Sequence, residues 1–316
     1  MIQPKNNETQ VREFIARLGL SPTQVLKIMI DSEQVNQVDQ SCLLQFPPGG
    51  ITILELFCYW INLMEPPSRY FMQVLSEFVE SDLHRKKLIE FSSKTVEGKS
   101  EYYRYCVRER RTVIEVLFDF QQEKVTLPLE YLIQLCARQR PREFSISSAM
   151  RVHPSQAHIT MAVTEYQTKF KREKKGICSS WLRDQGTDPI PIWLKKGSFT
   201  FPDNPSTPLI MVGPGTGIAA FRSFIHHFSA SDRPLFLFFG CRSATADFYY
   251  QAEWFNIPNL HVFTAFSRDQ ESKRYVQHVI KEEADLLKPL ILEQNAYIYV
   301  SGRAKFMPQS VEKAFK

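Results

Sequence analysis

The stretch MVGPGTGIAAFR, residues 211–222, decides the fold of the C-terminal part of this 316-residue chain. It joins an apolar run of strand length, residues 208–212, to residues 218–228, whose composition favours a helix. Glycine permits a tight turn and lets backbone N–H groups approach a ligand closely, and the helix N-terminus adds a positive dipole. The stretch therefore predicts a strand, a turn and a helix that can hold a pyrophosphate, with Thr216 as an added hydroxyl donor.

The glycine spacing of this stretch differs from that of the usual dinucleotide fingerprint. Its glycines stand at positions 213, 215 and 217, whereas the fingerprint reads G-x-G-x-x-G. The next apolar run, residues 235–240, ends without the acidic residue that would hold a ribose hydroxyl. We therefore expect no adenosine diphosphate bound in the usual Rossmann manner. For the turn taken alone, a tight connection without a ligand remains an alternative.

A polar segment follows the third apolar run, residues 261–266, and has the composition of a phosphate site. Its two cations and three hydrogen-bonding groups are Ser267, Arg268, Lys273, Tyr275 and Gln277. A doubly charged 2′-phosphate needs such a set, because guanidinium and ammonium groups make strong charge-assisted hydrogen bonds. A solvated polar loop is the alternative, but the position after the third strand of a nucleotide-binding unit favours NADPH over NADH.

The overall composition is that of a soluble globular protein and argues against several functional classes. The formal net charge of +5 is mild, so it does not indicate nucleic-acid binding. The basic runs at residues 108–111 and 171–175 fit solvated faces or docking sites for an acidic partner. The six cysteines form no C-x-x-C pair and have no histidines at zinc spacing, which predicts free thiols in a reducing compartment and no metal site.

The sequence has no segment that would place the chain in a membrane. The first residues lack the apolar core of a signal peptide. The most apolar helix candidate, residues 51–64, is interrupted by Glu55 and Asn62 and is too short to span a bilayer. We therefore expect a cytoplasmic protein without a membrane partner.

The pattern of apolar residues divides the chain into two parts. The first part reads mainly helical, with helices expected at residues 11–18, 22–30, 51–64, 68–79, 83–91, 102–105 and 111–118. From residue 141 the pattern becomes β-like, which predicts a small antiparallel barrel with strands at residues 144–148, 158–166 and 190–194. Beyond the turn-rich stretch 195–208, apolar runs alternate with helical segments, which predicts a doubly wound parallel sheet.

Two further motifs are compatible with a flavin nucleotide. REFSISS, residues 142–148, would place Arg142 and Phe144 on one face of a strand and Ser145 on the other. This set can hold a diphosphate, pack an isoalloxazine and hydrogen-bond a redox-active nitrogen, although an ordinary half-buried strand has the same pattern. GICSSWL, residues 176–182, adds a helix start whose free N–H groups suit a phosphate; Ser179 or Ser180 can cap it, and a simple N-cap is the alternative. Together the two motifs favour FAD.

These motifs resemble those of the diflavin reductase family, and most closely its branch in cytosolic iron-sulfur assembly. R-x-F-S, G-x-C-S-S-W-L, G-P-G-T-G, F-F-G-C-R, A-F-S-R and Y-V-Q-H occur in family order, and the resemblance covers nearly the whole chain. It implies a ferredoxin-reductase-like architecture. An FAD-binding α+β barrel would occupy residues 1–203, with a helical connecting subdomain inserted at about residues 10–135, and an α/β NADP-binding domain would occupy residues 204–316.

The resemblance also implies which residues contact the cofactors. The residues expected at FAD are Arg110, Arg142, Glu143, Phe144, Ser145, Gly176, Ile177, Cys178 and Ser179. The residues expected at NADPH are Thr216, Ser267, Arg268, Lys273, Arg274, Tyr275, Val276 and Gln277. Ser145 would also stabilise the reduced flavin by hydrogen bonding, and Ser301 is the second candidate for a catalytic role.

The chain departs from the family pattern at the nicotinamide end. Ser301 replaces the cysteine of microsomal relatives, Arg303 replaces an acidic residue, and Ser310 replaces an aspartate. Ser301 therefore either orients the nicotinamide or is only a hydroxyl at the end of a strand. The resemblance also implies that the flavodoxin-like FMN domain, the first barrel strands and a terminal aromatic residue that stacks on the flavin are missing, which would leave an exposed barrel edge.

The function that the resemblance implies is hydride transfer from NADPH to FAD. In the complete family protein, electrons would pass on through FMN to an iron-sulfur acceptor protein. The expected partners are therefore this acceptor and the FMN domain. Two alternatives are a catalytically impaired module that binds nucleotides or partners, and another diflavin reductase such as methionine synthase reductase or a microsomal reductase.

Overall fold

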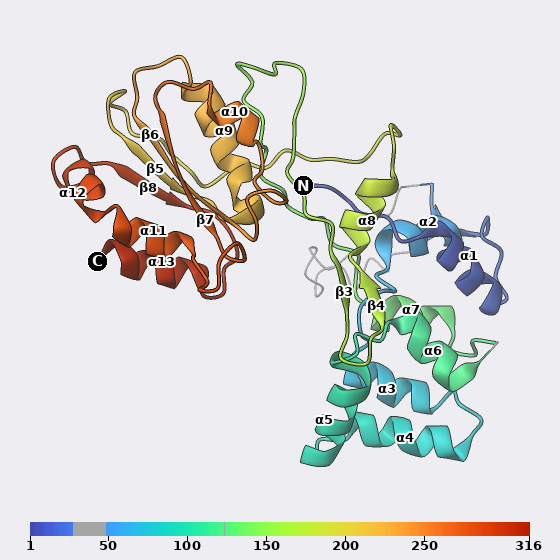
Figure 1. Cartoon of the computed structure of the whole chain (residues 1–316). Coiled ribbons are helices and arrows are strands. Elements are labelled where there is room, and N and C mark those ends of the chain that lie inside the picture. The colour runs from blue at the N-terminus through green and yellow to red at the C-terminus, as the bar shows by residue number, and fades with distance from the viewer. Residues whose placement is uncertain (28–48, 123) are drawn as a thin grey trace, which may run out of the picture. The chain divides into compact units, whose positions relative to one another are not determined.

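The structure is a computed structural model that describes residues 1–27, 49–122 and 124–316. These residues form two compact units (Figure 1). The first unit comprises Met1–Arg142 and Val163–Trp193, and the second comprises Glu143–Ala162 and Leu194–Lys316. The expected domain boundary at residues 203 and 204 stays a prediction.

The first unit is mainly helical and has its own apolar core. Its helices are α1 (Glu8–Arg17), α2 (Ile53–Glu55), the π-helix η2 (Leu56–Trp60), α3 (Arg69–Ser76), α4 (Asp82–Ser92), α5 (Val96–Tyr102), the π-helix η3 (Tyr103–Val107), α6 (Val113–Gln121), α7 (Leu129–Leu135) and α8 (Ile177–Asp184). Side-chain caps start many of them; Thr112, for example, forms a reciprocal capping box with Glu115. The apolar faces meet in one cluster, in which Phe14, Phe57 and Phe71 are fully buried.

Helices were predicted for most of this unit, and two predictions there are wrong in part. Residues 22–27 were predicted as part of a helix but contain the strand β1 (Val25–Leu26), which pairs antiparallel with β2 (Ile51–Thr52). Residues 28–30 of that prediction lie outside the described residues. The predicted helix at residues 51–64 begins at Ile53 because its first two residues pair with β1, and the backbone N–H of Ile53 donates to the carbonyl of Gln24.

Antiparallel pairing in the barrel region is short. In the first unit β3 (Glu165–Gln167) pairs with β4 (Glu173–Lys175), and Ile2 forms single bridges to Arg142 and Ile192. In the second unit Ile146 forms one bridge to Ile159. The predicted continuous strands at residues 144–148, 158–166 and 190–194 are therefore wrong in extent. Pro191 lies within the last of them and Pro189 directly before it, and both lack the N–H group that a ladder requires.

The second unit contains a parallel sheet of four strands, and the first three match the predicted apolar runs at residues 208–212, 235–240 and 261–266. The four strands are β5 (Leu209–Val212), β6 (Leu235–Cys241), β7 (Leu260–Phe266) and β8 (Tyr297–Val300), in the order β7-β6-β5-β8. All three pairings are parallel. Every residue of β5 is buried, as expected for an inner strand with both faces covered.

Helices cover both faces of this sheet (Figure 1). The helices α9 (Ile218–Phe228) and α10 (Gln251–Trp254) pack on one face, where Phe221 and Trp254 join one apolar cluster. On the other face lie α11 (Val276–Glu282), α12 (Ala284–Leu292) and α13 (Met307–Phe315). This arrangement confirms the predicted doubly wound sheet. Among the described residues no helix is both long and apolar enough to cross a bilayer.

Candidate functional site

The glycine-rich turn lies at the carboxyl end of β5 and packs against the end of β8. A Cβ atom at Gly217 would lie 2.1 Å from the carbonyl oxygen of Ser301. A Cβ atom at Gly213 would lie 2.6 Å from the ring of Phe221. A Cβ atom at Gly215 would meet no atom of the described residues within 4 Å, but Gly215 has a φ of +56°, a conformation that favours glycine. Each glycine is thus required by close packing or by backbone conformation, which brings the start of α9 to the edge of the sheet.

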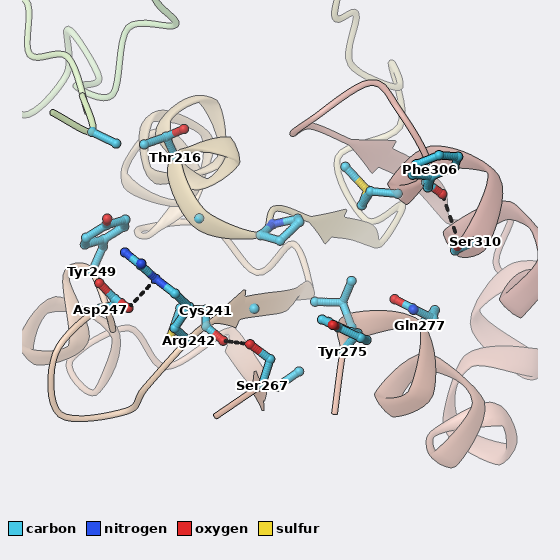
Figure 2. A pocket seen from close by; sticks show the side chains of 17 residues that line it. Thr216, Cys241, Arg242, Asp247, Tyr249, Ser267, Tyr275, Gln277, Phe306 and Ser310 are labelled. Atoms are coloured by element: carbon cyan, nitrogen blue, oxygen red, sulfur yellow. Dashed lines mark hydrogen bonds and ion pairs between the residues drawn. The ribbon is translucent and has the colours of Figure 1, made fainter. Parts of the chain in front are cut away.

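A cavity of about 540 Å³ opens beside this turn (Figure 2). Its walls come from the turn, from the ends of β6 and β7, from the start of α11, and from the start of α13 with the residue before it. The residues that line it include Pro214, Gly215, Thr216, Gly240, Cys241, Arg242, Asp247, Tyr249, Ala265, Ser267, Tyr275, Val276, Gln277, Phe306, Met307 and Ser310. A crevice at the carboxyl ends of parallel strands is where open α/β sheets bind ligands.

Five of the eight residues predicted at NADPH line this cavity. They are Thr216, Ser267, Tyr275, Val276 and Gln277. The Ser267 hydroxyl donates to the carbonyl oxygen of Cys241 at 3.2 Å, which fixes it at the end of the sheet (Figure 2). Tyr275 and Gln277 flank the buried Val276 at the start of α11. The structure therefore brings together the turn and the polar segment, which are about fifty residues apart in sequence.

The three predicted cations, Arg268, Lys273 and Arg274, differ in whether their side chains already have partners within the protein. The guanidinium of Arg274 donates to Glu282 and, at 3.3 Å, to the carbonyl oxygen of Thr264. Arg268 and Lys273 are exposed, and neither side chain has a hydrogen bond or ion pair within the described part of the chain. The backbone N–H of Arg268 donates to the carbonyl of Arg242 at 2.9 Å, so Arg268 lies beside the cavity wall. Arg268 and Lys273 thus retain their full capacity to bind an anion.

Some lining residues were not predicted. Arg242 follows the apolar run of β6 directly and forms an ion pair with Asp247 at 3.2 Å (Figure 2). Phe306 is exposed on the opposite wall, where its carbonyl accepts from the Ser310 hydroxyl at 2.9 Å. Arg242 could have been predicted to line the site, because it follows an apolar strand directly. The loop residues Asp247, Tyr249 and Phe306 carry no such sequence signal. Ser301 is not among the lining residues; its role at the nicotinamide stays a prediction.

In the first unit, the predicted phosphate site at residues 176–179 is the N-terminus of α8. Gly176 is the N-cap, and no side chain of the described residues caps the helix. The prediction that Ser179 or Ser180 caps it is wrong, because both residues lie inside the helix. The Ser179 hydroxyl instead accepts from the backbone N–H of Thr164 at 3.0 Å and donates to the carbonyl of Gly176 at 3.3 Å. Within the described part of the chain, the N–H groups of the first turn are therefore left without a side-chain cap.

Two features of this helix start bear on the predicted phosphate site, which stays a prediction. Burial raises the pKa of the Cys178 thiol, and the charge of the Arg142 guanidinium acts in the opposite direction. The Ser180 hydroxyl is buried without a hydrogen-bond partner in the described chain. It borders a cavity of about 1320 Å³ that Gly176 and Ile177 also line. A cation and free N–H groups are what the diphosphate of FAD requires.

The remaining residues predicted at FAD lie apart from this helix in the chain. Arg110 is exposed and has a φ of +50° after η3. Glu143, Phe144 and Ser145 belong to the second unit. Glu143 forms an ion pair with Lys195 at 2.6 Å, Phe144 is half-buried and Ser145 is exposed. Their contacts with a flavin stay predictions.

Comparison with known proteins identifies the family. Residues 1–181 match the FAD binding domain family, and residues 211–313 match the oxidoreductase NAD-binding domain family. The chain belongs to the FAD binding domain family. This assignment confirms the predicted ferredoxin-reductase-like architecture, in which an FAD-binding domain is followed by an NAD-binding domain with a parallel sheet.

Curated relatives agree with the expected resemblance to the diflavin reductase family. NADPH-dependent diflavin oxidoreductase 1 of Xenopus laevis is 41% identical over 323 residues, covering 100% of this chain and 52% of the relative. The proteins of the same name from Bos taurus and Arabidopsis thaliana are 39% and 35% identical, covering 98% and 99% of this chain and 52% of each relative. The chain is thus a homologue of this diflavin oxidoreductase and spans about half the length of the curated relatives it matches.

A partly buried ionic cluster on α9 and α10 is expected to make the stability of the protein depend on pH. His226 on α9 has its Nε2 atom 3.1 Å from Glu253 on α10, while its Nδ1 atom is buried without a partner in the described residues. Burial and the nearby Arg222 charge lower the pKa of His226, with a smaller contribution from His153, and Glu253 opposes them. Protonation would place a second N–H donor where no acceptor lies, so the folded protein favours neutral His226.

This arrangement predicts a loss of stability on acidification. In the unfolded chain His226 gains a proton near its ordinary pKa of 6.5, whereas the folded chain resists that proton. The contribution of His226 is thus complete above pH 6.5 and is lost as the pH falls toward the lowered folded pKa. Urea unfolding on both sides of this range should show a smaller decrease for His226→Gln than for the wild type. His227→Gln, at the exposed neighbouring position, should decrease like the wild type; equal decreases in all three proteins would contradict the assignment.

Proposed function

We propose that this chain binds FAD and NADPH and catalyses hydride transfer from NADPH to FAD. The observation that carries the proposal is the cavity at the carboxyl ends of β5, β6 and β7, in a chain that also contains an FAD binding domain. Thr216 and Ser267 supply hydroxyl groups at this cavity, and Arg268 lies beside it without a partner in the described residues. An unengaged guanidinium suits the 2′-phosphate that distinguishes NADPH from NADH.

The FAD-binding residues would act through orientation and electrostatics. Arg142 and the N-terminus of α8 would hold the diphosphate, because they combine a cation with free N–H groups. Phe144 would pack on the isoalloxazine, and the Ser145 hydroxyl would donate a hydrogen bond to its redox-active nitrogen. When bound, the isoalloxazine supplies the acceptor for the hydride. The protein contributes by holding both nucleotides in a reactive geometry.

The wider role that we propose is electron delivery to an iron-sulfur protein. The relatives are named diflavin oxidoreductases, which supports a second flavin in the complete protein. Electrons would leave FAD for FMN in a flavodoxin-like domain and then reach an iron-sulfur acceptor of cytosolic assembly. Such a pathway would place the protein in the cytoplasm, where thiols such as Cys58 and Cys106 stay reduced.

Steady-state turnover with an artificial acceptor tests the proposed function. The chain is first loaded with FAD and freed of excess flavin, and ferricyanide reduction is then followed with NADPH or NADH. We expect turnover with NADPH, and a kcat/KM for NADPH at least about tenfold above that for NADH, because one charge-assisted contact is worth about 1.5–3 kcal/mol. Equal rates with the two nucleotides would contradict the NADPH assignment.

A further inference from the structure

The segment that carries Phe144 and Ser145 is fastened to α9 by two consecutive backbone carbonyls. Arg222 Nη1 donates to the carbonyl oxygen of Ser147 at 2.9 Å. The hydroxyl of the next residue, Ser223, donates to the carbonyl oxygen of Ser148 at 3.0 Å. Ser147 and Ser148 follow Ser145 by two and three residues. The backbone after Ser145 is therefore fixed in position by side chains of α9.

Arg222 is itself held in a single geometry. It is only 7% exposed, and its Nε and Nη2 atoms donate to the two carboxylate oxygens of Glu253 at 2.7 and 2.9 Å. Its guanidinium lies 4.5 Å from the ring centre of Tyr250. Glu253 is partly exposed, but a bidentate arginine–carboxylate pair is geometrically specific, because two parallel N–H···O bonds fix the plane of the guanidinium. Arg222 thus forms a rigid connection between Glu253 and the backbone at Ser147, unlike a flexible contact on the surface.

A second attachment lies on the returning part of the same segment. The Tyr250 hydroxyl hydrogen-bonds the Thr160 hydroxyl at 2.6 Å. Thr160 follows Ile159, which forms an antiparallel bridge with Ile146. Tyr250 also packs against Arg222. The backbone at Ser147 and the returning part of the segment at Thr160 are therefore both held by the Arg222–Tyr250 pair.

The same helix also fixes the dinucleotide turn. α9 begins at Ile218, directly after Gly217, and Thr216 of that turn lines the cavity. Arg222 lies about one helical turn after the start of α9, since a turn contains about 3.6 residues. One rigid helix therefore connects the turn at the NADPH cavity to the backbone that presents Ser145.

We propose that Arg222 is a positioning residue for hydride transfer. It sets the place of Ser145, and hence of the flavin that Ser145 contacts, relative to the nicotinamide nucleotide held at the start of α9. This inference rests on the proposed function. Arg222 need not touch either cofactor, so its loss should slow the transfer step while leaving nucleotide affinity largely intact. A misplacement of about 1 Å can lower a rate by about a hundredfold.

The chain offers a matched control in Arg233. This arginine is 5% exposed, donates to the carbonyl oxygens of Thr207 and Asn204 at 2.9 and 3.1 Å, and lies 4.7 Å from the ring centre of Phe228. Like Arg222 it is a buried arginine that donates to backbone carbonyls, but it has no ion pair within the described residues and it holds a different segment. Arg222→Lys and Arg233→Lys both keep the charge and remove the planar fork.

The test compares anaerobic flavin reduction by NADPH in the wild type and both variants, each loaded with FAD. For Arg222→Lys we expect a rate about 10- to 100-fold lower, with FAD content and the Kd for NADPH within about twofold of the wild type. Deuterated NADPH should give a larger isotope effect in this variant, because transfer becomes more fully rate-limiting. Arg233→Lys should lose stability but keep its rate within about twofold.

The outcomes separate the inference from the proposed function. If the wild type is not reduced by NADPH, the proposed function fails and the inference fails with it. If the wild type is reduced but both variants slow equally, or Arg222→Lys reacts at the wild-type rate, only the inference is overturned. Should Arg222→Lys not fold, Ser223→Ala removes one carbonyl contact while Arg222 remains. The inference then requires a slower transfer rate in Ser223→Ala at unchanged NADPH affinity, and an unchanged rate overturns it.

Discussion

Replacing Gly217 with alanine is expected to abolish NADPH-dependent flavin reduction and to destabilise the second unit. The new Cβ atom would lie 2.1 Å from the carbonyl oxygen and 2.8 Å from the carbonyl carbon of Ser301. Both atoms belong to backbone beside β8, so no side-chain rotation can relieve the clash. Overpacking typically costs about 1–3 kcal/mol, and a backbone clash should lie at the upper end. Displacement of the turn should lower the reduction rate at least about a hundredfold.

Two other glycines provide graded controls for this result. Gly215→Ala meets no atom within 4 Å but forces alanine to a φ of +56°, which should cost about 1–2 kcal/mol. Gly197→Ala meets no atom within 4 Å and no strained φ, so its effect should stay within about 0.5 kcal/mol. Urea unfolding measures the free energy of unfolding of each variant, and NADPH titration measures its affinity for NADPH. Wild-type stability and NADPH affinity in Gly217→Ala would show that the turn does not require this close approach.

Removing the charges of Arg268 and Lys273 should abolish the preference for NADPH over NADH. In Arg268→Gln and Lys273→Gln each charge-assisted contact is lost, which is worth about 1.5–3 kcal/mol, or at least about tenfold in KM for NADPH. The double variant should therefore raise KM for NADPH about a hundredfold or more. KM for NADH should change little, since NADH has no 2′-phosphate. Steady-state assays with both nucleotides measure the change.

Arg274 and salt provide the controls for this prediction. Arg274→Gln should affect KM for NADPH less than Arg268→Gln, because the Arg274 side chain is already committed to Glu282 and the carbonyl of Thr264. Added salt should raise KM for NADPH in the wild type more than in the double variant, because exposed charges are screened. Equal increases in KM for NADPH and NADH would mean that these cations do not recognise the 2′-phosphate.

The sequence predicted the second unit well because its signals are local. The strands β5 and β6 are continuous apolar runs buried on both faces, and the glycine turn marks where β5 ends. The cation Arg274 shows the limit of such signals. Its charge and position were recognised, but Glu282, eight residues later, engages its guanidinium only once α11 has formed.

The first unit was less predictable because tertiary contacts decide its short elements. β1 exists only because Ile51 and Thr52 lie beside it, and its sequence does not show this pairing. Likewise, Ser179 resembles a helix cap, but Thr164 engages its hydroxyl from another segment. Arg222 ends the glycine-rich stretch 211–222, and no role for it could be predicted from the sequence. Its partners Ser147 and Glu253 are distant in sequence and only the fold brings them to it.

Anaerobic addition of NADPH to the FAD-loaded chain tests the central claim most directly. The visible absorption band of the oxidised flavin should be lost after one equivalent of NADPH, and NADH at the same concentration should act much more slowly. Loss of the band would establish that one chain binds both nucleotides and transfers hydride between them. Binding of FAD and NADPH without loss of the band would contradict the proposed reaction and favour a module that only binds nucleotides.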